Sequence, residues 1–156
     1  MRHPHPARTA AALAAVAVVA VPGAAQAAQD SATSFVVNTQ FRSGPSPILS
    51  ATGPLATCTT ATENEGSQAI PTGPRTLLFV GTKTLDCADG TVTIAYQATI
   101  NNSSGRKTFG TWSVIDSTLP GVEYGGGRLV GDAARCELLP GSEGCILDTF
   151  TGHVGA

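Results

Sequence analysis

Apolar and polar residues alternate over much of the chain, most clearly in residues 91–100. Five apolar side chains occupy every second position there: Val92, Ile94, Tyr96, Ala98 and Ile100. Threonine and glutamine fill most of the positions between them. A period of two is typical of a β-strand with one face buried and the other in water. After residue 27, no long window shows the spacing of an amphipathic helix, so the sequence predicts an all-β fold.

Shorter alternating or apolar runs, separated by turn residues, predict further strands at 33–42, 48–51, 55–62, 75–86, 106–116, 125–132 and 145–154. Asp89-Gly90 predicts a hairpin before residue 91, because glycine tolerates the positive φ of a tight turn. The residues at 101–105 predict another turn. About eight short strands favour an eight-stranded antiparallel barrel, with a β-sandwich as the alternative.

The first 27 residues have the pattern of a secretory signal peptide. A basic start is followed by an apolar run over residues 10–21 and by Ala25 and Ala27, where a signal peptidase reads small residues. The run is shorter than the ~20 residues that cross a bilayer as a helix. We therefore expect a signal peptide over 1–27 and one secreted, extracellular domain over 28–156 without stable membrane insertion. The Ala- and Val-rich leader indicates a bacterial source.

The charge of the chain argues against a nucleic-acid partner. Cleavage after Ala27 would remove Arg2 and Arg8 from the nine basic residues and none of the eleven acidic ones. The remaining basic residues are scattered, and only Arg106 and Lys107 are adjacent. Nucleic-acid binding needs a concentrated basic surface. We expect a mildly acidic protein that binds no nucleic acid.

The four cysteines, Cys58, Cys87, Cys136 and Cys145, predict two disulfides in an oxidising compartment. Of the three possible pairings, local arguments favour Cys58–Cys87 and Cys136–Cys145. The second pair flanks a Leu-Pro-Gly turn, and Cys87 precedes the Asp-Gly turn. Since the chain has no Cys-x-x-Cys and one histidine after the leader, the sequence predicts no metal site, cofactor or redox-active dithiol.

Three motifs lie in the C-terminal half of the chain: Gly110-Thr111-Trp112-Ser113-Val114, then the Gly-rich run over 121–131, then Asp148-Thr149-Phe150-Thr151-Gly152-His153-Val154. Together they resemble the closing strands of the allene oxide cyclase-like barrels, and the chain looks like a small secreted bacterial protein of that type. The resemblance covers residues 77–154 and implies a calycin-like barrel with an interior cavity. The plant cyclases use their cavity to isomerise a fatty-acid epoxide. No catalytic residue of those enzymes is carried over to this chain.

Asp148 is the main candidate for chemistry, because it shares its parity with Ile146 and Phe150. An inward carboxylate needs hydrogen-bond partners and is then a site candidate. We favour the other interpretation, that Asp148 caps a turn or bonds to backbone near the start of its strand. Tyr96, Phe109 and Trp112 are the large aromatic residues of the central strands, and they either line a cavity or fill the core.

Other polar residues are expected at the surface. We place Glu63 and Glu65 in a solvated loop, with contact to a cation as the alternative, and His153 on an exposed strand end. Glu123 and Tyr124 are read as a polar loop, with an acid and a phenol at the barrel mouth as the alternative.

Three hypotheses for function follow. The first is a disulfide-stabilised barrel without catalytic machinery, whose candidate partner is a small apolar molecule. The second is a cyclase- or isomerase-like enzyme that uses the barrel cavity. The third is an immunoglobulin-like interaction or adhesin domain, which predicts two sheets with open edges instead of a closed barrel. Two or more buried, convergent titratable groups inside the barrel would favour the enzyme. The oligomeric state stays open.

Overall fold

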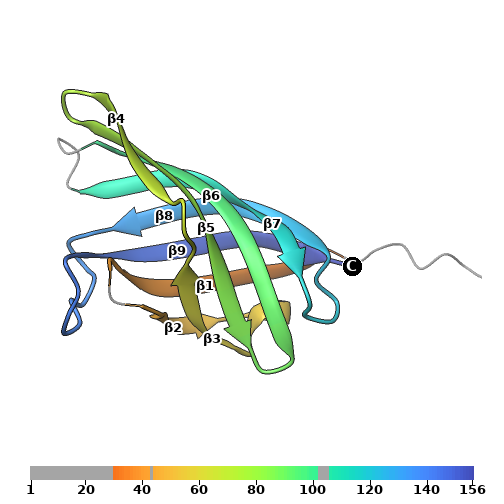
Figure 1. Ribbon diagram of the computed structural model, residues 1–156. Helices are drawn as coiled ribbons and strands as arrows, with labels where there is room; N and C mark the ends of the chain where they lie inside the picture. The colour runs from red at the N-terminus through yellow and green to blue at the C-terminus, as the bar shows by residue number, and fades with distance from the viewer. Residues whose placement is uncertain (1–29, 43, 102–105) are drawn as a thin grey trace, which may run out of the picture.

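The structure is a computed structural model that describes residues 30–42, 44–101 and 106–156. Within these ranges the chain forms one antiparallel sheet that curls into a barrel (Figure 1). Its strands are β1 (Ser31–Gln40), β2 (Ser46–Ala51), β3 (Cys58–Glu63), β4 (Gln68–Gly73), β5 (Thr76–Cys87), β6 (Gly90–Asn101), β7 (Lys107–Ser117), β8 (Tyr124–Asp132) and β9 (Cys145–Gly155). A short 3-10 helix, η1 (Gly53–Leu55), precedes β3.

Pairing between β3 and β5 closes the barrel. The strand order is β3-β2-β1-β9-β8-β7-β6-β5, and β3 returns to pair with β5 from Cys58↔Cys87 to Glu63↔Lys83. The other half of β5 pairs with β4, which extends the sheet beyond the barrel (Figure 1). The predicted eight-stranded antiparallel barrel is therefore confirmed, with one extra strand. The β-sandwich alternative, and with it the open-edged immunoglobulin-like fold, is wrong.

Most of the predicted strands recur with boundaries shifted by a few residues, but the segment between β2 and β5 differs. The strand expected at 55–62 begins only at Cys58, because Gly53–Leu55 forms η1. The strand β4 was not predicted. It contains Pro71, which is tolerated there because an edge strand has no neighbour on its outer side. The expected signal peptide over 1–27 and residues 102–105 of the expected turn lie outside the described residues.

Two disulfides fasten the barrel at opposite ends, with the pairing that the local arguments favour. Cys58–Cys87 joins the paired ends of β3 and β5. Cys136–Cys145 closes the loop between β8 and β9. That loop lies against β1, where Asn38 Nδ2 donates a hydrogen bond to the Glu137 carbonyl oxygen at 2.8 Å.

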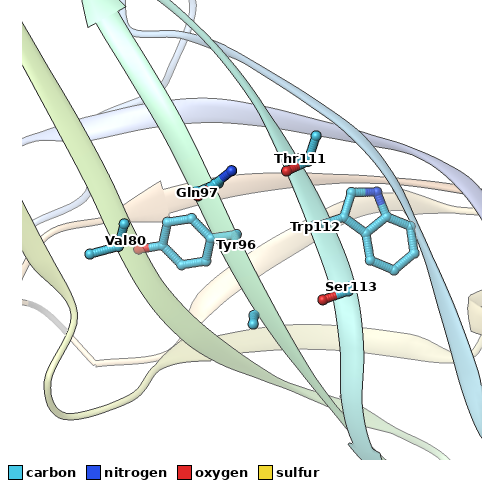
Figure 2. A pocket seen from close by; sticks show the side chains of 7 residues that line it. Val80, Tyr96, Gln97, Thr111, Trp112 and Ser113 are labelled. Carbon is cyan, nitrogen blue, oxygen red and sulfur yellow. The ribbon is translucent and has the colours of Figure 1, made fainter.

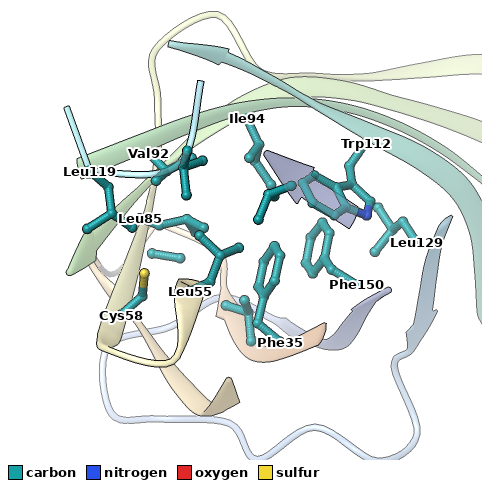
Figure 3. Packing of buried hydrophobic residues seen from close by; sticks show 14 of the residues in the cluster. Phe35, Leu55, Cys58, Leu85, Val92, Ile94, Trp112, Leu119, Leu129 and Phe150 are labelled. Carbon is teal, nitrogen blue, oxygen red and sulfur yellow. The ribbon is translucent and has the colours of Figure 1, made fainter. Parts of the chain in front are cut away.

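The alternation of side chains fills one end of the barrel with apolar groups (Figure 3). Phe35 of β1 and Phe150 of β9 stack at 4.4 Å between ring centres, and Trp112 of β7 packs edge-on against Phe35 at 5.5 Å. Leu55 of η1 and Leu119 close this end. Each fully buried side chain of this size contributes about 1.5–3 kcal/mol relative to an exposed one. We call this region the packed end.

Phe109 does not line the interior, so that prediction is wrong. Its side chain is 58% exposed, and its partner in the register is Val130, which is also exposed. The reason is parity: Phe109 and Trp112 are three positions apart on one strand, so they face opposite sides of the sheet. Trp112 faces inward and fills the core.

The outer face of β5, β6 and β7 carries a shallow depression of about 330 Å³ (Figure 2). Uncharged side chains surround it: Val80, Ala95, Gln97, Thr111 and Ser113. Tyr96 and Trp112 complete its lining, so no side chain of the depression carries a charge at neutral pH.

Candidate functional site

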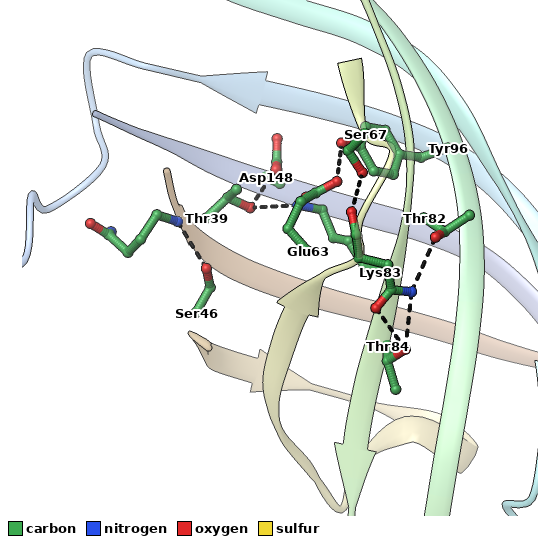
Figure 4. A network of polar contacts seen from close by, with 11 residues as sticks. Thr39, Ser46, Glu63, Ser67, Thr82, Lys83, Thr84, Tyr96 and Asp148 are labelled. Carbon is green, nitrogen blue, oxygen red and sulfur yellow. Dashed lines mark hydrogen bonds and ion pairs between the residues drawn. The ribbon is translucent and has the colours of Figure 1, made fainter. Parts of the chain in front are cut away.

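A cluster of polar side chains occupies the barrel interior at the end opposite the packed end (Figure 4). Its members come from five strands, and each lies two residues from an apolar inward position on its own strand. They are Thr39 of β1, Glu63 of β3, Lys83 of β5, Tyr96 of β6 and Asp148 of β9. Strand alternation therefore aims all five toward the barrel axis. We call them the interior polar cluster.

Lys83 and Glu63 form an ion pair at the centre of the cluster. The distance from Lys83 Nζ to Glu63 Oε2 is 2.5 Å, and the side chains are 3% and 28% exposed. Tyr96 donates its phenolic hydrogen to the other carboxylate oxygen, Glu63 Oε1, at 2.5 Å. Lys83 Nζ also lies 5.0 Å from the centre of the Tyr96 ring. A buried ammonium is costly unless it is paired and hydrogen-bonded, and these contacts meet that need.

Asp148 extends the cluster to β9. Thr39 Oγ1 donates a hydrogen bond to Asp148 Oδ2 at 2.6 Å, and Lys83 Nζ donates to Thr39 Oγ1 at 3.4 Å. Burial raises the pKa of Asp148 above that of an ordinary carboxyl, and the Glu63 charge raises it further. The Lys83 charge and the Thr39 hydrogen bond oppose that rise. Asp148 is buried and faces the interior within β9, so the favoured interpretation as a turn cap is wrong.

Tyr96 acts as a hydrogen-bond donor in this arrangement. Burial raises its pKa well above the ordinary value, and the charge and hydrogen bond of Glu63 raise it further. The phenol therefore stays protonated at neutral pH. It can donate a hydrogen bond but cannot serve as a base or a nucleophile there.

Gly81 of β5 makes room for this half of the cluster. A β-carbon at this position would come within 2.8 Å of Glu63 Oε1 and closer still to Ser67 Oγ. The turn after β3 is held nearby, because Asn64 Nδ2 donates to Thr82 Oγ1 at 3.0 Å and Ser67 Oγ donates to the Asn64 carbonyl oxygen. A residue without a side chain therefore lets the turn and Glu63 approach β5.

A cavity of about 380 Å³ opens at this end of the barrel. Glu63 and Tyr96 of the cluster line it, together with Gln40, Phe41, Arg42, Ser67, Gln68, Ala69 and Phe79. Arg42 pairs with Glu143 at 3.0 Å and is largely exposed. We call this space the mouth cavity. It joins two aromatic walls, Phe41 and Phe79, to one carboxylate and one phenol.

Below the mouth cavity lies a chamber of about 20 Å³. Phe41, Phe79 and Tyr96 line both spaces, whereas Lys83 and Asp148 line the chamber alone. The cluster thus spans two levels: Glu63 and Tyr96 face a molecule-sized space, and Lys83 and Asp148 face a much smaller one.

The structure brings together two residues that the sequence singled out, Tyr96 and Asp148, with three that it did not. Glu63 was expected in a solvated loop, which is wrong, since it ends β3 and binds Lys83. Lys83 went unnoticed, although it shares the parity of Leu85. Thr39 continues the inward series of β1 in the same way.

The remaining candidates lie elsewhere. His153 is exposed on β9. Tyr124 begins β8 near the packed end, away from the mouth cavity, and its hydroxyl donates to Asp30 Oδ1 at 2.7 Å.

Among the described residues, no three His, Cys, Asp or Glu side chains are placed to hold a metal ion. The same residues contain no helix long and apolar enough to cross a membrane. Comparison of the chain with protein-family models, with curated proteins and with solved structures finds no match.

Proposed function

We propose that the protein binds one small, mostly apolar molecule in the mouth cavity and recognises an uncharged polar group on it through Glu63 and Tyr96. The observation that carries this proposal is the cavity itself, about 380 Å³, with aromatic walls from Phe41 and Phe79 and with Glu63 and Tyr96 among its polar side chains. Small-molecule sites are typically 300–1,000 Å³ in volume, mainly apolar, with a few placed polar groups.

The charges of the cluster favour an uncharged ligand group. The ammonium of Lys83 is already matched by Glu63 at 2.5 Å. An anionic group would face the carboxylate of Glu63, and a cationic group would compete with Lys83. Because an unpaired charge in a partly buried site is costly, a hydroxyl, amide or carbonyl group fits better.

We further propose that the chain is an allene oxide cyclase-like barrel protein that is secreted. The closed antiparallel barrel and the positions of the three motifs on β7, β8 and β9 support the first part. Two disulfides fit an oxidising, extracellular-type environment and support the second.

Ligand binding can be tested with N-phenyl-1-naphthylamine, an uncharged aromatic probe whose fluorescence rises in apolar sites. We expect saturable binding to the wild type and at least tenfold weaker binding to Ala69→Trp, which fills the cavity from β4. Ile70→Trp is the matched control, because Ile70 is the next residue on β4 and does not line the cavity. Absence of saturable binding to the wild type, or equal binding by Ala69→Trp, would contradict the proposal.

The natural ligand can be sought by native mass spectrometry of protein purified from culture medium. We expect a mass lowered by four hydrogens from the two disulfides and an additional species with one bound small molecule. A mass that still includes residues 1–27 would contradict secretion through a cleaved leader.

An acid–base isomerase or cyclase is the second candidate. Convergence of four titratable side chains, Glu63, Lys83, Tyr96 and Asp148, favours it, because buried titratable groups gather at catalytic sites. The test is the rate at which the protein converts a fatty-acid epoxide, the substrate class that the resemblance implies. Enzymatic turnover should fall about 100-fold in Tyr96→Phe and Glu63→Gln. A wild-type rate equal to that in buffer rejects this candidate for that substrate.

A further inference from the structure

The chamber beneath the mouth cavity contains an unpartnered polar group. Thr108 of β7 is 2% exposed, and its Oγ1 is the one buried side-chain oxygen or nitrogen without a hydrogen-bond partner among the described residues. Thr108 lines the chamber together with Lys83 and Asp148. A buried hydroxyl without a partner costs about 1–3 kcal/mol, so native proteins rarely leave one unsatisfied.

Gly131 of β8 brings this hydroxyl and Asp148 to the same space. A β-carbon at position 131 would come within 2.8 Å of Asp148 Oδ1 and closer still to Thr108 Oγ1. Both oxygens therefore face the volume that a side chain at this inward position of β8 would fill. Oδ1 is also the oxygen of Asp148 that does not receive the Thr39 hydrogen bond.

Lys83 can supply a third contact. Its ammonium has three N–H groups, and hydrogen bonds to Glu63 and Thr39 use two of them. Lys83 lines the chamber, so its ammonium can direct the third N–H group into that space. Two donors and one acceptor thus face a space whose other walls are Thr39 and Tyr96, whose hydroxyl hydrogens are already donated to carboxylates, and the apolar or aromatic side chains of Phe41, Phe79, Ala98, Leu129 and Ile146.

We propose that the chamber binds one water molecule, which accepts a hydrogen bond from Lys83, bonds to Thr108 Oγ1 and donates to Asp148 Oδ1. A cavity needs about 10–15 Å³ and two to four polar partners to hold one water, and the chamber has about 20 Å³ and three partners. The chamber is too small for a second molecule. The water would connect β7 to the interior polar cluster and complete its hydrogen bonding.

The substitution Thr108→Val tests this water, because the expected change in Tm has opposite signs for a hydrated and a dry chamber. Valine keeps the shape of threonine and removes the hydroxyl. If water is bound, it loses a partner and the Tm falls, by roughly 3–5 °C for a loss near 1 kcal/mol. If the chamber is dry, valine removes an unsatisfied buried hydroxyl and the Tm rises. Thr111→Val, on the exposed face of the same strand, is the control and should change the Tm little.

A crystal structure of the wild-type protein at high resolution gives an independent readout. Density for one water within hydrogen-bond distance of both Thr108 Oγ1 and Asp148 Oδ1 is the expected result. An empty chamber, or a higher Tm in Thr108→Val, would overturn the proposal. Neither measurement involves a ligand in the mouth cavity, so failure here is distinct from failure of the proposed binding function.

Discussion

On four strands, the inward-facing side chains change from apolar at the packed end to polar at the next inward position. At the packed end, β1, β5, β6 and β9 contribute Val37, Leu85, Ile94 and Phe150, all with 0% exposure. Two residues along each strand, the next inward positions are Thr39, Lys83, Tyr96 and Asp148. The same backbone geometry therefore supports two different interiors.

The difference teaches what each end contributes. Apolar burial at the packed end stabilises the fold in proportion to the area removed from water. The interior polar cluster requires desolvation of charges, and replacement of such clusters by apolar residues is often neutral or stabilising. Stability alone therefore does not explain the cluster. Its position beside the mouth cavity is what links it to the proposed binding function.

The largest expected effect is at the packed end. Phe150→Ala removes a ring that stacks on Phe35 and should lower the free energy of unfolding by about 3–5 kcal/mol. Phe109→Ala removes the same ring from the exposed face and should cost less than about 1 kcal/mol. Urea unfolding with both disulfides intact measures the two. Equal losses would mean that the inward and outward faces of the barrel are assigned wrongly.

Phe109 also shows how far sequence patterns reach. The period of two predicted the barrel. Parity also turns Asp148 inward with Phe150 and turns Phe109 outward, opposite to Trp112, but neither direction was the favoured prediction. Residue type outweighed spacing in the prediction, although spacing decides which face a strand residue occupies.

The pair of Glu63 and Lys83 lay beyond such patterns. The two residues are 20 positions apart and meet because β3 closes the barrel against β5, a pairing of strands that are not consecutive along the chain. Local alternation carries no information on that closure. The extra strand β4 was missed for a different reason, since Pro71 lowers the strand signal at an edge where it is tolerated.

The next effect tests whether the interior polar cluster is truly buried. Lys83→Met leaves Glu63 without its cation and should lower the free energy of unfolding by about 2–3 kcal/mol, somewhat below a fully buried pair because Glu63 is partly exposed. The double variant Lys83→Met/Glu63→Gln removes both charges of this pair and should recover most of that loss. A double-mutant cycle by urea unfolding measures the coupling. Coupling below about 0.5 kcal/mol would place the pair in solvent.

A smaller effect is expected from adding a methyl group at a glycine beside the mouth cavity, compared with a glycine elsewhere on the sheet. Gly81→Ala places a methyl group against Ser67 and Glu63, so it should shift the turn and cost about 1–2 kcal/mol. It should also weaken binding of the naphthylamine probe. Gly73→Ala is the control, because its methyl group would meet only Thr76, at an ordinary 3.8 Å. Unchanged probe binding by Gly81→Ala would show that Glu63 need not keep its present position.

The smallest expected effect is the pH dependence that Asp148 contributes to the polar end. Because burial raises the pKa of Asp148 in the folded protein, the folded state holds this proton more tightly than the unfolded chain. The resulting stability is complete below the ordinary value of 3.8 and is lost as the pH rises through the raised pKa. The side chain in the variant Asp148→Asn cannot ionise, so the variant lacks this pH-dependent loss of stability.

Thermal melts of the wild type and Asp148→Asn from about pH 4 to about pH 8 measure that difference. The Tm of the wild type minus that of the variant should fall as the pH rises, while Asp116→Asn, on the exposed face of β7, controls for removal of a carboxylate at the surface. Other carboxyls titrate in both proteins and largely cancel in the difference. If the difference instead rose with pH, Asp148 would be stabilised as a carboxylate by Lys83 and Thr39, and the polar end would be organised around two ion pairs with one shared cation.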